Sequence, residues 1–374
     1  MSIPQYTKRR DPRITVGAIV AVIIIAVAGF AIWSWPKHKM YVYTYDSFMA
    51  WGDDPSTIDE RVFGQFELTH GVDIEIVRLQ TDASGIVARL NAEASKPVAD
   101  VVIGIDNVLV MQEAARAVLE PYNATGVELI DTRLVNALSP DHYLTPFDFG
   151  IIAVVYSLAD MNTTTHPVLA NLTFEALAAP DMASALVTEN PHLSSPGLAF
   201  MLSQIAAYEK ILGKDWTEWW TQVKSKIDVQ QGWSEAWSKW DDDPTRHMLV
   251  SYGTDPAYSA YYTGSAPNIG VAPFVYNNSS YAWLQVEGVG VVKNGPNPGL
   301  ARAFVDYCLT LPVQQQIALN QWMFPVSPGV TLPEAFQYAL HPEDVTDLNQ
   351  YLSATEIRAN LTQWLDEWDI IMTQ

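Results

Sequence analysis

The residues of this chain best suited to hold a ligand are tryptophans and tyrosines in short polar segments. The chain has 13 Trp and 17 Tyr. Several cluster with Asp, Ser, Glu or Gln in the segments YVYTYDSFMAWG, QGWSEAW, SYGTDPAY and NQWMFPV. Aromatic faces attract cations by about 0.5–2 kcal/mol per contact, depending on desolvation. These segments favour a site for a flat, cationic heteroaromatic molecule, although any single Trp or Tyr is more often a core residue.

Charge and cysteine content exclude several kinds of function. The net charge is −21 over 374 residues. A chain this acidic repels phosphate backbones, so no nucleic-acid partner is expected. The one cysteine, Cys308, excludes a disulfide framework and a multi-thiolate metal site. Its helical context, ARAFVDYCLTL, predicts a buried, inert thiol.

The sequence makes no positive case for catalysis. The seven His residues show no helical ligand spacing, and the motifs HExxH, GxSxG, GxGxxG and the P-loop do not occur. We therefore expect no enzyme, no metal and no cofactor.

The N-terminal segment carries a membrane signal. Residues 14–34 contain no charged side chain, and a helix of that length spans about 31 Å, the thickness of a bilayer core. Basic residues precede it, which predicts a cytoplasmic N-terminus and an extracytoplasmic body. We expect an uncleaved single-pass anchor over residues 14–35 in the cell membrane. Cleavage of a signal peptide after Ala28 is the alternative.

Glycosylation sequons also favour export. The motif N-x-S/T begins at Asn123, Asn162, Asn171, Asn277, Asn278 and Asn360. The sequence does not tell whether they are glycosylated.

Strand and helix patterns alternate at the start of the exported body. We expect strands at 41–45, 72–79 and 99–105, and helices at 55–70, 83–95 and 107–118. This order predicts a parallel α/β sheet with right-handed crossovers. Ligands bind at the carboxyl ends of strands in such sheets, where Tyr45-Asp46 and Asp106-Asn107 lie.

Later elements extend this α/β pattern. We expect an extended run at 146–157 that crosses between lobes, a helix capped by Ser195 that runs to about Leu212, a strand at 285–293 and a helix at 299–319.

Nine motifs in a fixed order carry a family resemblance. They are YTYDSF, the Trp of AWG, ADVVIGIDN, PFDFG, SSPGL, QGWSEAW, SYGTDPAY, YAWLQVEG and NQWMFPV. On these motifs the chain resembles the thiamine-binding proteins of bacterial ABC importers, which are type II periplasmic solute-binding proteins. The resemblance covers about residues 40–370.

The resemblance implies a fold and its boundaries. It implies two α/β lobes joined by crossing strands, with the ligand in a cleft that closes by a hinge motion. The expected parts are a cytoplasmic N-terminus at 1–13, an anchor at 14–35, a first lobe at 40–148 and 276–331, and a second lobe at 149–275 and 332–374.

It also implies a function and a set of site residues. The function is capture of thiamine or thiamine phosphate and delivery to an ABC permease with its ATPase. The aromatic box falls on Tyr45, Trp51, Trp233, Tyr258 and Trp322, with Tyr252 as a further cleft tyrosine, Asp46 and Asp106 as polar groups near the ligand, and Ser195 and Gly197 in the loop at its hydroxyethyl or phosphate end. Two departures are a shorter segment before Trp51 and Phe324 in place of a tyrosine.

Other functions stay open at this point. The ligand could instead be another cationic amine, a pyrimidine precursor, or ferric ion bound by Tyr261-Tyr262, although no His-Glu partner is evident. A thiaminase-like enzyme would need Cys308 as its nucleophile. The sequence does not decide between thiamine and its phosphates, and it does not give the oligomeric state.

Overall fold

The computed structural model describes residues 38–373. The expected anchor at 14–35 and the alternative cleavage site at Ala28 lie outside the described residues. Within residues 38–373, no helix combines the length and the apolar character needed to cross a bilayer.

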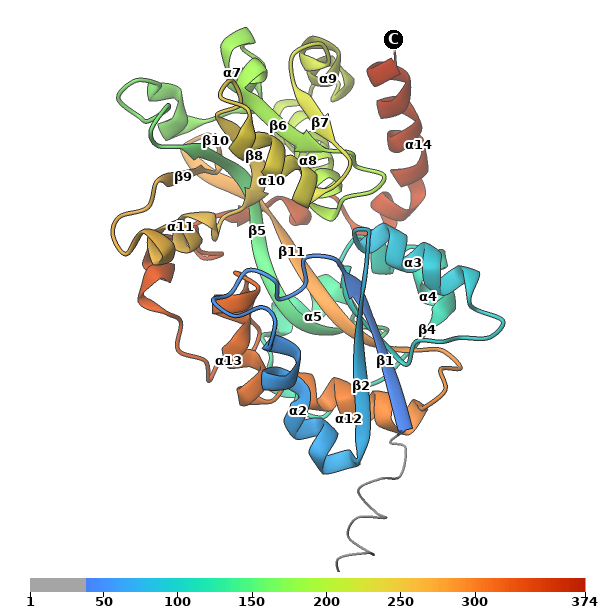
Figure 1. The fold of residues 1–374 in the computed structure, drawn as a ribbon. Coiled ribbons are helices and arrows are strands. Elements are labelled where there is room, and N and C mark those ends of the chain that lie inside the picture. Colours follow the sequence, from blue (N-terminus) through green and yellow to red (C-terminus); the bar gives the residue numbers. More distant parts are fainter. Residues whose placement is uncertain (1–37, 374) are drawn as a thin grey trace, which may run out of the picture.

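Two lobes are joined by two long strands, β5 (Thr145–Ser157) and β11 (Ser279–Val292) (Figure 1). These two strands pair antiparallel at the centre of the sheet, whose order is β2-β1-β3-β11-β5-β8-β6-β7. We call the β1–β3 side the first lobe and the β6–β8 side the second lobe. The predicted two-lobed α/β fold is confirmed.

The first lobe is built on parallel strands, as predicted, because β1 pairs in parallel with both β2 and β3. Helix α2 places Val62, Phe63 and Phe66 on its buried face, at the spacing of an amphipathic helix. The strands are β1 (His38–Tyr45), β2 (Val72–Leu79), β3 (Val101–Asp106), β4 (Leu119–Glu120) and β12 (Phe324–Pro325). The helices are α2 (Ile58–His70), α3 (Ala83–Ala92), η1 (Leu109–Met111), α4 (Glu113–Val118), η2 (Val127–Leu129), α5 (Thr132–Leu138), α12 (Pro298–Cys308) and α13 (Leu311–Asn320).

The second lobe surrounds α8, a helix in which every residue is buried. Its strands are β6 (Leu186–Glu189), β7 (Asp228–Gln230), β8 (Met248–Tyr252), β9 (Ile269–Ala272) and β10 (Phe274–Tyr276). Its helices are η3 (Pro167–Asn171), α6 (Phe174–Leu177), α7 (Pro180–Ala185), α8 (Ser195–Ile205), the π-helical η4 (Ala206–Leu212), α9 (Thr217–Val223), α10 (Trp233–Asp242) and α11 (Asp255–Thr263).

The C-terminal segment reaches the second lobe. It contains η5 (Glu334–Tyr338), β13 (Thr346–Asp347), η6 (Leu348–Tyr351) and the long helix α14 (Ala354–Thr373). Helix α14 packs against α9 (Figure 1). The rings of Trp220 and Trp368 meet there edge-on at 5.7 Å.

Two predicted helices are interrupted. The helix expected at 107–118 becomes η1 and α4, because Gln112 between them has an extended conformation (φ −75°, ψ 141°). The Asp106 carboxylate accepts the backbone N–H groups of Val108 (2.6 Å) and Leu109 (2.9 Å) just before η1. The helix expected at 299–319 breaks between α12 and α13. Pro312 has no N–H to donate and its ring clashes with the preceding turn, so a continuous helix cannot form there.

The start of α8 also differs from the prediction by one residue. Ser194, not Ser195, is the residue that precedes the helix, and Ser195 is the first helical residue. The chain continues as a π-helix to Leu212 and ends at Gly213, whose φ of 64° is favourable for glycine.

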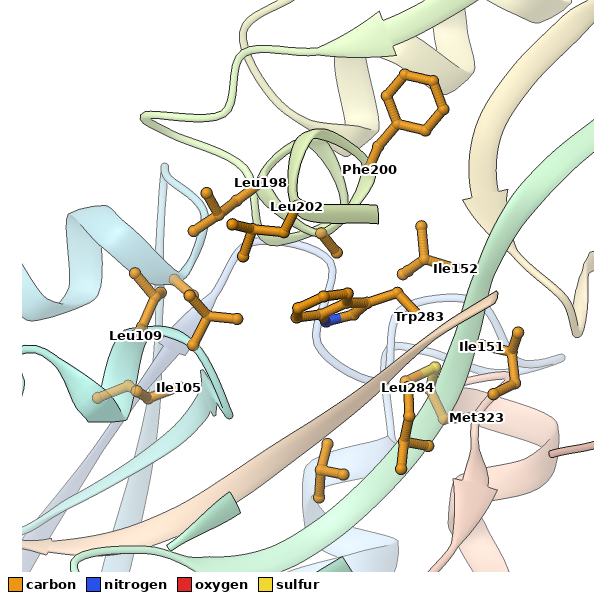
Figure 2. Packing of buried hydrophobic residues seen from close by; sticks show 14 of the residues in the cluster. Ile105, Leu109, Ile151, Ile152, Leu198, Phe200, Leu202, Trp283, Leu284 and Met323 are labelled. Atoms are coloured by element: carbon orange, nitrogen blue, oxygen red, sulfur yellow. The ribbon is translucent and has the colours of Figure 1, made fainter. Parts of the chain in front are cut away.

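The hydrophobic core is centred where the two connecting strands meet α8. Ile152 of β5 and Trp283 of β11 lie on the side of the strands that faces the helix carrying Leu202, whereas Ile151 and Leu284 lie on the opposite side (Figure 2). Trp283 is only 1% exposed. The strands that join the lobes are thus part of the buried core.

The single cysteine is part of this packed interior. Cys308 lies in α12 with no exposed surface, and burial raises the pKa of its thiol far above the usual range. The prediction of a buried thiol is confirmed.

Candidate functional site

A pocket between the lobes, part of whose roughly 720 Å³ of empty space is open to solvent, is lined by residues from both of them. The lining residues are Tyr45, Ser47, Trp51, Asp82, Ala83, Gly104, Ser195, Pro196, Trp233, Trp237, Tyr252, Asp255, Tyr258, Glu287, Gln321, Trp322 and Met323. Strand ends of β1, β3 and β8 and helix starts of α3, α8, α10 and α11 therefore meet at one place.

Aromatic rings from the two lobes contact each other across this pocket. Trp51, in the loop after β1, meets Trp233 edge-on at 5.3 Å and lies 5.7 Å from Trp237, both on α10. It also meets Tyr258 of α11 at 6.1 Å, and Tyr258 meets Trp322 at 5.3 Å. We call these five residues the aromatic cluster. Edge-to-face pairs of this kind are a favoured aromatic geometry.

Local backbone geometry positions these rings. Trp233 and Trp237 are four residues apart on α10, so they lie on one face of the helix. The Trp233 indole N–H donates to the Ser251 hydroxyl at 2.9 Å. Trp322 has a φ of 56°, an unusual conformation for a bulky residue, and its indole N–H donates to the Trp51 carbonyl at 2.9 Å.

A polar network forms another part of the wall. The Tyr45 hydroxyl donates to Glu287 Oε2 at 2.8 Å. The Gln285 amide donates to Glu287 Oε1 at 3.1 Å and to the Tyr252 hydroxyl at 2.8 Å. Gly104 is required beneath the Tyr45 ring, because a Cβ there would lie 2.3 Å from a ring carbon and φ is +99°. Both oxygens of Glu287 are therefore held by neutral donors.

The ionisable side chains that line the pocket are acidic or phenolic. Among the described residues, the lining includes no Lys, Arg or His. Burial raises the pKa of Asp82 to about 6, that of Asp255 to about 7 and that of Glu287 to about 8. A positive ligand would favour the charged form of each of these groups.

A second carboxyl lies behind Glu287. The strand register places Asp148 of β5 directly opposite Glu287 of β11. Asp148 is fully buried, and neither of its oxygens has a hydrogen-bond partner within residues 38–373. Burial, and then repulsion from Glu287, raise the pKa of Asp148 well above its usual value. Two such close carboxyls favour holding a proton.

The chain matches the family of bacterial extracellular solute-binding proteins over residues 50–315. This match spans most of the chain and includes both lobes. The chain belongs to this family.

Several relatives of this solute-binding protein share the name thiamine-binding periplasmic protein. The thiamine-binding periplasmic protein of Escherichia coli strain K12 is 30% identical over 337 residues, which cover 89% of this chain and 93% of that protein. That of Brucella abortus is 28% identical over 347 residues, covering 92% and 95%.

Solved structures agree with the fold of this solute-binding protein. A periplasmic thiamin binding protein superposes with a TM-score of 0.74 at 27% identity, covering 91% of this chain and 98% of that one. A ferric binding protein from Campylobacter jejuni superposes with a TM-score of 0.68 at 16% identity, which shows a shared fold alone.

Most sequence-predicted site residues of the solute-binding protein lie together at the pocket. The ones in its lining are Tyr45, Trp51, Ser195, Trp233, Tyr252, Tyr258 and Trp322.

The other three do not line it. Asp106 is buried and accepts hydrogen bonds from the Ser195 hydroxyl and from two backbone N–H groups, so it orders a turn. Gly197 permits close packing, because a Cβ there would lie 2.5 Å from the Glu189 carbonyl oxygen. Asp46 is half-buried outside the lining.

Sequence reasoning missed several lining residues. Trp237 could have been found from the sequence signal of its spacing, because it follows Trp233 by one helical turn. Asp82 had a weaker one, since it lies between a parallel strand and the next helix, where ligands bind. Asp255 lies three residues before Tyr258. Glu287 had no signal, since it sits inside an apolar strand pattern.

The tyrosine pair considered for iron is not part of the pocket lining, although both rings pack against Trp322, at 5.5 Å and 6.0 Å. Tyr261 and Tyr262 are 37% and 46% exposed, and their hydroxyls donate to Asp53 and to the Trp51 carbonyl, both at 2.9 Å. Within the described part of the chain, no group of three or more His, Cys, Asp or Glu is arranged to hold a metal ion.

Proposed function

We propose that this chain is the solute receptor of an ABC importer and that it captures thiamine in the pocket between its lobes. The observation that carries the proposal is the combination of the aromatic cluster with three pocket-lining carboxyls and, among the described lining residues, no basic side chain. The names of the relatives from Escherichia coli and Brucella abortus support the same ligand.

The chemistry of the pocket suits that ligand. Thiamine has a permanently positive thiazolium ring and a flat aminopyrimidine, and both can stack on Trp and Tyr faces. Asp82, Asp255 and Glu287 would balance the charge. At about 0.5 kcal/mol for each of roughly eighteen non-hydrogen atoms, binding would reach about −9 kcal/mol, a sub-micromolar Kd.

The proposal includes the ligand contacts. We assign the aromatic faces to Tyr45, Trp51, Trp233, Tyr258 and Trp322, with Tyr252 and Ser195 as polar contacts. We add Trp237 to the aromatic contacts, since it lies between Trp51 and Tyr258.

The proposal also includes the mechanism of delivery. The lobes, taken as 40–148 with 276–331 and 149–275 with 332–374, would close around the ligand by bending of β5 and β11. The closed receptor would then deliver thiamine to an ABC permease driven by its ATPase. The body would act outside the cytoplasm, held at the membrane by residues 14–35.

The thiol that a thiaminase-like reaction would use lies outside this pocket. Cys308 is buried in α12 and is not among the pocket-lining residues. The tyrosine pair that would bind ferric ion is also outside the pocket.

Titration of tryptophan fluorescence tests the function. Because four of the pocket residues named above are tryptophans, thiamine should quench the emission saturably at or below micromolar concentration. Thiamine phosphates and ferric citrate are titrated in parallel. A response to ferric citrate without a response to thiamine would overturn the ligand assignment.

A further inference from the structure

Asp255 is the pocket carboxyl with the weakest protein support for a negative charge. It is 5% exposed and lines the pocket, yet its Oδ2 atom is buried with no hydrogen-bond partner within the described chain. By contrast, both oxygens of Glu287 accept hydrogen bonds, and Asp82 accepts the Trp233 backbone N–H at 3.4 Å. A buried acceptor without a partner at a pocket wall points to a group that arrives with the ligand.

The immediate surroundings favour a cation at Asp255. It begins α11, one turn before Tyr258, and it shares the pocket lining with Trp233. Ser251 accepts the Trp233 indole N–H, so its own hydroxyl hydrogen is free to support the charged form of Asp255. A flat cation between these two rings would lie next to a carboxyl that has no competing positive charge.

The other ionisable groups around Asp255 are acidic or phenolic. They are Glu189 from β6, Tyr258 from α11, Asp82 from the start of α3, Tyr45 from β1, Tyr252 from β8 and Glu287 from β11. Of the other elements that pack on α11, β9 has no ionisable side chain and Glu334 and Tyr338 of η5 are exposed. Lys239 of α10 is paired with Asp243 at 2.8 Å and Asp228 at 3.6 Å.

Burial without a partner keeps Asp255 partly protonated in the empty pocket. Burial raises the pKa of Asp255 to about 7, and the Ser251 hydroxyl opposes this only in part. A fixed positive charge beside the carboxyl favours the charged form, so it lowers this pKa again. Below pH 7, capture of a cation must then release a proton, and affinity must rise with pH until the carboxyl is already ionised.

We propose that Asp255 is a specificity-determining residue that selects ligands with a permanent positive charge. When the cation enters, the Asp255 carboxyl loses its proton to solvent and becomes the counter-charge. A neutral ring of the same shape leaves the carboxyl protonated and gains nothing from it. This inference rests on the proposed function, since it takes thiamine as the cation.

The test compares thiamine with an uncharged isostere whose thiazolium ring is replaced by thiophene. Calorimetry with the full chain at pH 6 and pH 8, in buffers of different ionisation enthalpy, yields both Kd and the number of protons released. With a pKa of about 7, Asp255 is about one-tenth ionised at pH 6 and about nine-tenths at pH 8. Its ionisation therefore contributes about a tenfold improvement in the Kd of thiamine over this range.

Asp255→Asn isolates this contribution from those of Asp82 and Glu287. In the variant, the improvement in the Kd of thiamine from pH 6 to pH 8 should be about tenfold smaller than in wild type. The variant should also release fewer protons at pH 6 and discriminate less between thiamine and the isostere. Asp242→Asn is the matched control, because it removes one exposed carboxyl of α10 that does not line the pocket. It should behave as wild type.

The outcomes separate the two claims. Thiamine binding with wild-type pH dependence in Asp255→Asn overturns the role of Asp255 and leaves the proposed function intact. If the wild-type chain binds thiamine at neither pH, the proposed function is overturned and the inference with it. Thermal unfolding checks that the variant is folded, and Asp255→Ser replaces it if it is not.

Discussion

Two tryptophan pairs on neighbouring helices of the second lobe have different roles. Trp219 and Trp220 of α9 have no exposed surface, and their indole N–H groups donate to Phe174 O (2.7 Å) and Gln204 Oε1 (3.2 Å) within the same lobe.

Trp233 and Trp237 of α10 are half-buried and contact Trp51 of the opposite lobe. The residue type is the same, but only the second pair depends on how the lobes meet. We therefore expect substitutions in the α9 pair to affect mainly stability and substitutions in the α10 pair to affect mainly ligand binding.

The largest expected effect comes from a substitution in the core pair, Trp219 and Trp220. Trp219→Ala leaves a large cavity and an unpaired Phe174 carbonyl, so it should lower the free energy of unfolding by about 3–5 kcal/mol. Urea unfolding measures this value. The folded fraction should still bind thiamine with an unchanged Kd, because Trp219 does not line the pocket. A loss below about 1 kcal/mol would contradict its place in the core.

The next largest effect comes from a substitution in the pocket pair, Trp233 and Trp237. Trp233→Ala removes a ring from the aromatic cluster and should weaken thiamine binding by about 1–3 kcal/mol. Its cost in urea unfolding should be smaller than that of Trp219→Ala, since Trp233 is half-buried. Trp322→Ala should weaken binding to a similar extent. Wild-type affinity in both variants would sink the site assignment.

A third experiment extends the comparison to the buried carboxyls of the connecting strands. The pKa of Glu287 is raised by burial to about 8, and that of Asp148 is also raised, so the folded chain holds protons that the unfolded chain releases. The contribution of these two carboxyls to the free energy of unfolding is therefore full below about pH 3.8, and it falls as pH rises to about 8, by up to about 1.4 kcal/mol per pH unit per proton.

Asp148→Asn should flatten this decline and raise the melting temperature at pH 8 relative to wild type. Thermal unfolding from pH 5 to pH 8 measures it. Asp243→Asn serves as the control, because Asp243 is on the surface and paired with Lys239. Equal slopes for Asp148→Asn and wild type would show that the pair does not hold a proton.

The smallest effect concerns the cysteine. Cys308→Ala removes a small buried side chain in α12, away from the pocket, and should cost about 1 kcal/mol of stability or less. Thiamine affinity should not change, and mass spectrometry should find thiamine intact after incubation with either protein. Thiamine breakdown that depends on Cys308 would favour the enzyme reading.

The strands and the parallel opening were predictable because they rest on local periodicity. The strand at 72–79 has the expected bounds, and those at 41–45 and 146–157 lie within β1 and β5. Two predicted helices are interrupted where a single residue changes the backbone, as Gln112 does between η1 and α4 and Pro312 does at the start of α13.

The candidate site divides in the same way. Aromatic site residues could be found because Trp and Tyr are conspicuous in short polar segments. The acidic ones were assigned to Asp46 and Asp106, whereas the pocket is lined by Asp82, Asp255 and Glu287. Carboxylates are frequent in so acidic a chain, and only the tertiary structure decides which of them line the pocket.

The sequence by itself determined the class of fold, the order of the strands and helices, and the aromatic character of the ligand site, because periodicity and residue type are local properties. The tertiary structure decided which tryptophans are core and which face the other lobe. It also decided which carboxyls lose their water and their partners. Glu287 opposes Asp148, and Asp255 shares the pocket lining with Trp233, only through folding of distant segments. Desolvation and contact depend on that three-dimensional arrangement, so no local pattern encodes them.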